Sequence, residues 1–140
     1  MVVVDASVAL KWFVQEEGTP SALSMLASAD SLIAPELVIA EMCNGAWRMS
    51  QTGRMTKEQA MIVAARAGRL FHETVSLDRL SVRASQLAFL LDHPAYDCFY
   101  LALAEQRQTE VVTADRRFVE KTRGTAWADR VVLLTDVAQP

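Results

Sequence analysis

The chain has 140 residues, 51% of them hydrophobic and 22% charged, and its formal net charge is −3. This composition excludes a disordered chain, and the length fits one domain with its own core, which we expect to span residues 1–140. The longest unbroken apolar stretch, Cys98 to Ala104, is far shorter than a membrane span. The N-terminus has no basic lead-in of the kind that precedes a secretory signal, so we expect a cytoplasmic protein.

Hydrophobic periodicity predicts strands that alternate with helices along the whole chain. In chain order we expect a strand at 2–5, a helix at 6–15, a helix running to about Ala29 after a break at 18–20, a strand at 31–34, a helix from Pro35 to about Ser50, a helix after Thr56, a strand at 74–75, helices at 77–91 and 95–108, and strands at 110–113 and 131–134.

Cap and break residues set the predicted boundaries. Pro35 is expected in the first turn of its helix, and Thr56 is a plausible N-cap of the next one. Gly53 separates these two helices, which predicts a helical hairpin standing on the sheet. Because helices separate the strands, the strands should pair in parallel through right-handed crossovers. We therefore expect a three-layer α/β/α sandwich with a central, mainly parallel sheet of about five strands.

Cysteine and histidine usage gives no sign of a zinc site. Cys43 and Cys98 form no CxxC pair, and the chain has two histidines, His72 and His93. Free cysteines are often buried, so we interpret both as small buried hydrophobic residues.

Two predicted strands lead into aspartates. Asp5 follows Val2-Val3-Val4, and Asp115 follows the strand that contains Val111-Val112. In open α/β sheets, ligands bind beyond the carboxyl ends of the strands, near a switch in strand order. Asp is also a preferred helix N-cap, and at either position alone the cap interpretation fits equally well. A site at this edge needs further acids that converge on it.

Asp97 and Glu41 are acids in apolar surroundings. Asp97 lies in a helix that is apolar nearly all round, where a carboxylate is costly unless it is paired or bound to a metal. A favourable interaction with the helix dipole is the alternative, worth only about 0.3–1 kcal/mol. Glu41 has Asn44 and Gly45 as helix-face neighbours, which predicts room for a ligand beside it. The alternative there is an exposed Glu on an amphipathic helix.

The other acids have polar or terminal contexts, and we interpret them as solvated surface. They are Glu16, Glu17, Asp30, Glu58, Glu73, Asp78, Glu105, Glu110, Glu120, Asp129 and Asp136.

Four carboxylates in apolar surroundings would repel one another, and at least one would be pushed toward protonation. A hard divalent cation relieves this repulsion, and oxygen ligands without His or Cys favour Mg²⁺ or Mn²⁺. Water bound to such an ion can serve as a nucleophile, which suits the cleavage of a phosphodiester.

The motifs that carry these acids resemble the PIN-domain ribonucleases, and most of all the VapC-type toxins of bacterial toxin–antitoxin pairs. The similarity covers essentially the whole chain in the family's motif order. The matching segments are Val4-Asp5-Ala6-Ser7, Pro35-Glu36-Leu37 through Glu41 and Asn44, Tyr96-Asp97-Cys98-Phe99-Tyr100-Leu101-Ala102-Leu103-Ala104, and Thr113-Ala114-Asp115-Arg116-Arg117-Phe118.

This resemblance implies a PIN-like fold and an acidic site for Mg²⁺ or Mn²⁺ made by Asp5, Glu41, Asp97 and Asp115. Asp5 and Asp97 are the implied direct ligands, while Glu41 and Asp115 bind a second ion or hold metal-bound water. Three further residues match accessory positions. Ser7 and Thr113 are implied to orient water or a carboxylate, with a cap and a turn residue as the alternatives, and Asn44 has a supporting role.

The resemblance also implies an activity and partners. The activity would be metal-dependent endonucleolytic hydrolysis of RNA by a toxin that inhibits translation. The partners would be a cognate antitoxin, whose tail lies across the acidic groove, and a second copy of the chain in a homodimer. Trp12, Phe13 and Trp47 are candidate apolar anchors for the antitoxin, with core packing as the alternative.

The net charge of −3 is unfavourable for RNA binding, because phosphate contacts need Lys and Arg. Without the four site acids, however, 14 basic residues face 13 acidic ones. Arg116 and Arg117 are the expected substrate-binding residues. Lys11, Lys121 and Arg123 are further candidates for a phosphate-facing edge, and for each residue an ordinary solvated helix is the alternative.

Three rival classes of protein also place acids on such a fold. A receiver-like phosphoacceptor needs an adjacent acid pair early and a Lys late, whereas Ala6-Ser7 follow Asp5 and arginines follow Asp115. A haloacid-dehalogenase-type phosphatase needs Asp-x-Asp, and this chain has Asp-x-Ser. A non-catalytic protein-binding α/β module would not need a carboxylate in the apolar helix around Asp97.

Overall fold

The fold is built on one sheet of five parallel strands. The computed structural model of the chain describes residues 1–28 and 30–137. Its strands are β1 (Val2–Val4), β2 (Leu32–Pro35), β3 (Glu73–Val75), β4 (Val111–Thr113) and β5 (Val131–Leu133). The strand order is β3-β2-β1-β4-β5, and all four neighbouring pairs are parallel. The prediction of a mainly parallel sheet of about five strands is thus confirmed.

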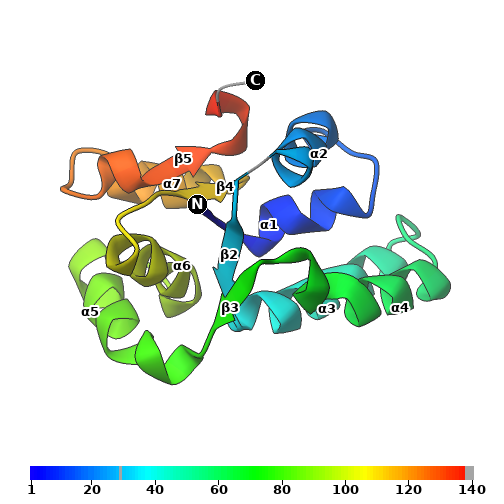
Figure 1. Cartoon of the computed structure of the whole chain (residues 1–140), viewed down its shortest axis with the longest axis horizontal. Coiled ribbons are helices and arrows are strands. Elements are labelled where there is room, and N and C mark those ends of the chain that lie inside the picture. The colour runs from blue at the N-terminus through cyan, green and yellow to red at the C-terminus, as the bar shows by residue number, and fades with distance from the viewer. Residues whose placement is uncertain (29, 138–140) are drawn as a thin grey trace.

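Helices cover both faces of this sheet (Figure 1). The α-helices are α1 (Ala6–Ala9), α2 (Thr19–Ala27), α3 (Leu37–Gln51), α4 (Lys57–Arg66), α5 (Ser81–Leu91), α6 (Ala95–Gln106) and α7 (Arg116–Thr122). The chain steps from β1 to β2 and β3 in one direction, then crosses back to β4 and β5 in the other. Because parallel crossovers are right-handed, this reversal puts α1 to α4 on one face and α5 to α7 on the opposite face.

The core lies on both sides of the central strand. All three valines of β1 are buried, and β1 pairs with β2 on one side and β4 on the other. Helix α6 packs against β1, β2 and β4, and its residues from Tyr100 to Ala104 are buried. This position explains why α6 is apolar nearly all round, and it brings the start of α6 to the carboxyl ends of the central strands.

Several predicted boundaries differ from the structure. The helix expected at 6–15 is the four-residue α1 followed by a 3₁₀ turn, η1 (Leu10–Trp12), because the chain then enters a loop closed by Thr19, whose hydroxyl donates to the Val14 carbonyl at 2.8 Å. Pro35 is the last residue of β2, opposite Val75, and does not open α3. The expected end at Ala29 lies outside the described residues.

The helix expected at 77–91 is also divided. A 3₁₀ turn, η3 (Leu77–Arg79), precedes α5, and Leu80 between them has a φ of −115° and is almost completely buried. Burial of this leucine side chain in the core accounts for the break in the helix.

The helical hairpin is confirmed. Helices α3 and α4 pack against each other, and the chain between them turns at Gly53, whose φ is +76°. Thr56 caps α4 in a capping box: its hydroxyl accepts from the Gln59 amide at 3.1 Å, while the Gln59 side chain accepts from the Thr56 amide at 2.7 Å. The two cysteines are free, with Cys98 buried and Cys43 partly buried.

Candidate metal centre

The strand order reverses between β1 and β4, and the candidate site lies beyond the carboxyl ends of these two strands. Asp5 directly follows β1, and Asp115 follows β4 after one intervening residue, Ala114. This switch in strand order is where an open α/β sheet leaves a crevice for a ligand.

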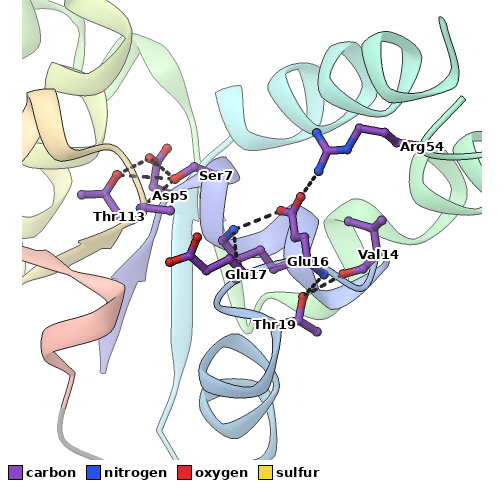
Figure 2. Close-up of polar contacts among 10 residues, drawn as sticks. Asp5, Ser7, Val14, Glu16, Glu17, Thr19, Arg54 and Thr113 are labelled. Atoms are coloured by element: carbon purple, nitrogen blue, oxygen red, sulfur yellow. Dashed lines mark hydrogen bonds and ion pairs between the residues drawn. The ribbon is translucent and has the colours of Figure 1, made fainter. Parts of the chain in front are cut away.

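Asp5 is a buried carboxylate held by two hydroxyl groups. Its side chain is 4% exposed, and its Oδ2 accepts hydrogen bonds from Ser7 Oγ and Thr113 Oγ1, both at 2.7 Å. Figure 2 shows the three side chains together. Asp5 makes no side-chain cap to α1, so the cap interpretation is wrong here. Burial raises the pKa of Asp5 to about 6, a rise that the two hydroxyl groups oppose and repulsion from Asp97 increases.

Glu41 reaches the same crevice from α3. The Tyr100 hydroxyl, completely buried on α6, donates to Glu41 Oε1 at 2.7 Å. The pKa of Glu41 is raised to about 7, chiefly by burial and further by repulsion from Asp5 and Asp97. The alternative of an exposed Glu on an amphipathic helix does not fit these contacts.

Asp97 lies in the first turn of α6, between the other acids. Its Oδ2 is 2.6 Å from Nε2 of His93. The pKa of Asp97 is raised, chiefly by burial, although the contact with His93 opposes the rise. Repulsion from Asp115 also raises the pKa of Asp97. Because Asp97 in turn repels Asp5 and Glu41, it is the acid that links the others.

Asp115 is the N-cap of α7. Its Oδ1 accepts from the Arg117 amide at 2.9 Å, and its own amide donates to Thr113 Oγ1 at 3.1 Å. The cap interpretation is therefore right for Asp115. It does not exclude a role in the site, because the capped carboxylate still interacts with Asp97.

The four acids thus come from four segments and form one chain of mutual repulsion. Within residues 1–28 and 30–137, however, no group of three or more His, Cys, Asp or Glu side chains is arranged so that it could hold a metal ion. The arrangement is an open cluster of carboxylate oxygens, in which the pKa values of Asp5, Glu41 and Asp97 are raised.

The accessory residues divide into two groups. Besides contacting Asp5, Ser7 Oγ accepts from the Ala114 amide at 3.0 Å, so Ser7 and Thr113 tie β4 to the start of α1. Asn44 is exposed on α3, and its side chain makes no hydrogen bond within residues 1–28 and 30–137. The expected space beside Gly45 is filled: a Cβ there would lie 2.4 Å from Leu10 Cδ1, so Gly45 allows close packing of α3 and leaves no room for a ligand.

Some of the predicted phosphate-binding residues line a cleft beside the acids, and others do not. Arg116 and Arg117 are exposed and line a cleft of about 490 Å³ together with His93, Asp97, Asp115 and Lys121. Arg117 Nε lies 3.6 Å from Asp115 Oδ1.

Lys11 binds other partners: its Nζ donates to Glu16 Oε1 at 3.0 Å and to the Glu17 carbonyl at 2.7 Å. Arg123 pairs with Glu120 at 3.0 Å.

The profile of the PIN domain matches residues 2–124, which include all four acids. The chain belongs to the PIN-domain family. It is 28% identical over 122 residues to ribonuclease VapC3 of Pyrobaculum aerophilum, covering 86% of this chain and 93% of that protein.

Solved structures share the PIN fold with this chain at low sequence identity. A toxin–antitoxin complex from Klebsiella pneumoniae aligns with a TM-score of 0.67 at 15% identity, over 98% of this chain and 100% of the other. VapC20 of Mycobacterium tuberculosis, a toxin that cleaves the sarcin-ricin loop, aligns with a TM-score of 0.65 at 16% identity, over 86% and 94%. The strand order of this PIN domain also differs from the 2-1-3-4-5 order of receiver proteins, which removes that alternative.

Two residues at the candidate PIN-domain site were missed in the sequence. In the sequence, His93 is noted only as one of two histidines that form no zinc pattern, and Tyr100 only as part of the apolar segment around Asp97. A signal was available, because His93 is four residues before Asp97 and Tyr100 three residues after it, the spacings at which side chains meet on a helix. No helix in the described part of the chain is long and apolar enough to cross a lipid bilayer.

Proposed function

We propose that this PIN-domain protein is a metal-dependent endoribonuclease, and that Asp5, Glu41, Asp97 and Asp115 form its active site. The observation that carries the proposal is the mutual repulsion of these four acids at the switch in strand order. Burial makes the negative charge of Asp5, Glu41 and Asp97 costly, so the folded chain is prepared to bind a cation there.

The residues fit a hard divalent cation. PIN-domain nucleases are typically metal-dependent. The candidate ligands are all carboxylate oxygens, which favour Mg²⁺ or Mn²⁺. Mg²⁺ usually keeps several waters and binds through one or two carboxylates, so a closed cage of three side chains is not required. When bound, the ion would lower the pKa of a water molecule and neutralise negative charge that develops on the phosphate.

The protein's own groups would position the reaction. Asp5 and Asp97 are the proposed direct ligands, and Glu41 and Asp115 would hold water or a second ion. The hydroxyl groups of Ser7 and Thr113 hold the Asp5 carboxylate in place. Arg116 and Arg117, exposed along the cleft, would bind RNA phosphates on either side of the cleaved bond.

The names of the relatives support a proposal for the cellular role. VapC3 is named a ribonuclease, and the Klebsiella structure is a toxin–antitoxin complex. We infer that this chain is the toxin of such a pair, that it inhibits translation by RNA cleavage in the cytoplasm, and that a cognate antitoxin holds it inactive.

The exposed Trp47 on α3 remains a candidate anchor for the antitoxin. Trp12 is instead engaged with Phe71 and the Ala22 carbonyl. We also propose a homodimer, the commonest oligomer, and gel filtration at micromolar protein tests it: elution at the monomer mass would contradict it.

Cleavage of RNA by the purified chain tests the enzymatic proposal. We expect endonucleolytic products with Mg²⁺ or Mn²⁺ and none with EDTA. Asp5→Asn and Asp97→Asn should each reduce the rate by about 100-fold or more, beyond the roughly 10–100-fold typical of residues that only surround a metal ligand. Asp129→Asn, an exposed acid outside the cleft, is the matched control and should cleave at the wild-type rate. Equal rates for all four proteins would overturn the assignment.

A further inference from the structure

His93 is held by the ends of two helices. Its amide donates to the Ala88 carbonyl of α5 at 3.1 Å, after Asp92 has turned the chain with a φ of +49°. Pro94 follows as the N-cap of α6. The backbone of His93 is therefore fixed on both sides, although it lies between helices.

The imidazole ring is fixed as well. The side chain is 7% exposed, and the ring stacks on Phe118 with a centroid distance of 5.3 Å and an angle of 9° between the planes. Phe118 is completely buried in α7, the helix that Asp115 caps. The ring therefore packs against α7, which Asp115 caps, and also contacts Asp97.

The contact with Asp97 is directional. Nε2 of His93 lies 2.6 Å from Oδ2 of Asp97. An ionised carboxylate has only acceptor sites, so the shared proton belongs to Nε2. In the part of the chain that the structure describes, this is the one side-chain hydrogen bond to Asp97, and it uses one of the two oxygens. Without such a bond, the terminal torsion of an aspartate has a broad range.

We propose that His93 is a positioning residue that holds Oδ2 of Asp97, so that the other carboxylate oxygen faces a divalent cation in the cleft. This inference rests on the proposed function of the same site. It assigns to His93 more than packing, because stacking on Phe118 alone would not need a ring nitrogen. Residues that orient a metal ligand typically change metal affinity or activity by about 10–100-fold when they are replaced.

Two substitutions separate the hydrogen bond from the stacking. His93→Phe keeps an aromatic ring against Phe118 and removes the nitrogen. His93→Gln loses the ring and keeps an N–H group at a similar distance from the backbone. The control is His72→Gln, which changes the other histidine, whose Nδ1 accepts from the Leu32 amide far from the acids.

The measurements are Mn²⁺ affinity by isothermal titration calorimetry without RNA, melting temperature, and RNA cleavage at saturating Mn²⁺. We expect His93→Phe to weaken Mn²⁺ binding about 10-fold or more while its melting temperature stays near that of the wild type. His93→Gln should melt at a lower temperature and bind Mn²⁺ nearly as tightly as the wild type. His72→Gln should leave Mn²⁺ affinity unchanged.

The outcomes distinguish this inference from the proposed function. If the wild type binds Mn²⁺ and cleaves RNA, and His93→Phe binds Mn²⁺ equally well, the positioning role is wrong and the nuclease assignment stands. If His93→Phe does not fold, His93→Gln decides alone: wild-type affinity supports the role, and a tenfold loss contradicts it. A wild type that neither binds Mn²⁺ nor cleaves RNA overturns both.

Discussion

Two carboxylates labelled in Figure 2, those of Glu16 and Asp5, have opposite surroundings. Glu16 is 17% exposed, and its carboxylate accepts from Lys11 at 3.0 Å and pairs with Arg54. Asp5 is more deeply buried, and its partners are the neutral hydroxyl groups of Ser7 and Thr113. The chain therefore supplies cations to one acid and none to the other.

The same contrast extends to the other acids. Hydrogen bonds from Arg107 and Arg83 lower the pKa values of Glu73 and Glu105, whereas burial raises those of Asp5, Glu41 and Asp97. Acids paired with an internal cation stabilise contacts between segments of the fold. Asp5 and Glu41, whose hydrogen bonds come from hydroxyl groups, keep an electrostatic cost that a cation from solution can relieve, and this distinguishes them from the paired acids.

The largest expected effect is a pH dependence of stability in EDTA. The pKa of Asp5 is raised from 3.8 to about 6, so its contribution to the free energy of unfolding is fully present below pH 3.8 and is lost as the pH rises through 6. This shift corresponds to about 3 kcal/mol, of which roughly half falls between pH 5 and pH 8. Glu41 acts in the same direction between pH 4.5 and 7. Urea denaturation at both pH values should therefore show lower stability at pH 8.

Asp5→Asn tests the origin of this dependence. The amide oxygen of Asn can still accept from both hydroxyl groups, and it carries no charge at any pH. Between pH 5 and pH 8 the wild type should lose about 1.5 kcal/mol more stability than the variant. If both proteins respond equally to pH, burial of Asp5 is not the source, and the contrast with Glu16 fails.

The next effect is stabilisation by the metal at pH 8. A cation that binds only the folded chain stabilises it by about 2.7 kcal/mol at 100 times its dissociation constant. We expect this rise in the free energy of unfolding with Mn²⁺ for the wild type and little rise for Asp97→Asn. Asp129→Asn should respond like the wild type. An equal response from Asp97→Asn would place the bound metal outside the acidic cluster.

The sequence predicts the acids of the proposed site from two signals: Asp5 and Asp115 follow strands, and Glu41 and Asp97 have apolar neighbours. Asp97 lies in a helix that is apolar nearly all round, and the structure shows α6 packed under the central strands. The same local reasoning failed for Glu16, which was interpreted as solvated surface. Its partner Arg54 lies 38 residues away, and no local pattern predicts that contact.

For the sheet, the sequence predicts the strands and their parallel pairing but not their order. Alternation of strands and helices indicated parallel pairing, and five short strands were expected near their observed positions. The order β3-β2-β1-β4-β5, which makes Asp5 and Asp115 neighbours, depends on long-range pairing that hydrophobic periodicity does not encode. The contacts of His93 with Phe118 of α7 and of Tyr100 with Glu41 of α3 likewise join segments that are far apart in the sequence.

A smaller effect is expected when the internally paired acid is changed. Glu16→Gln removes the charge that faces Lys11, whose side chain is 13% exposed, and should lower the free energy of unfolding by about 1–2 kcal/mol. Mn²⁺ affinity and RNA cleavage should not change. Glu17→Gln, the exposed neighbour, is the matched control and should be neutral in urea denaturation. Weaker Mn²⁺ binding by Glu16→Gln would show that the two groups of acids are not independent.

The smallest effect concerns a more exposed pair, Arg107 with Glu73, whose two hydrogen bonds both measure 2.8 Å. Their side chains are 26% and 45% exposed, so water and salt weaken the attraction. Arg107→Gln should cost less than about 1 kcal/mol in urea denaturation, and less still at high salt. This pair and the Glu16 pair are both ion pairs, and they differ in burial. If Arg107→Gln lowered the free energy of unfolding as much as Glu16→Gln, burial would not set the strength of these contacts. The electrostatic cost assigned to the buried, unpaired acids would then lose its physical basis.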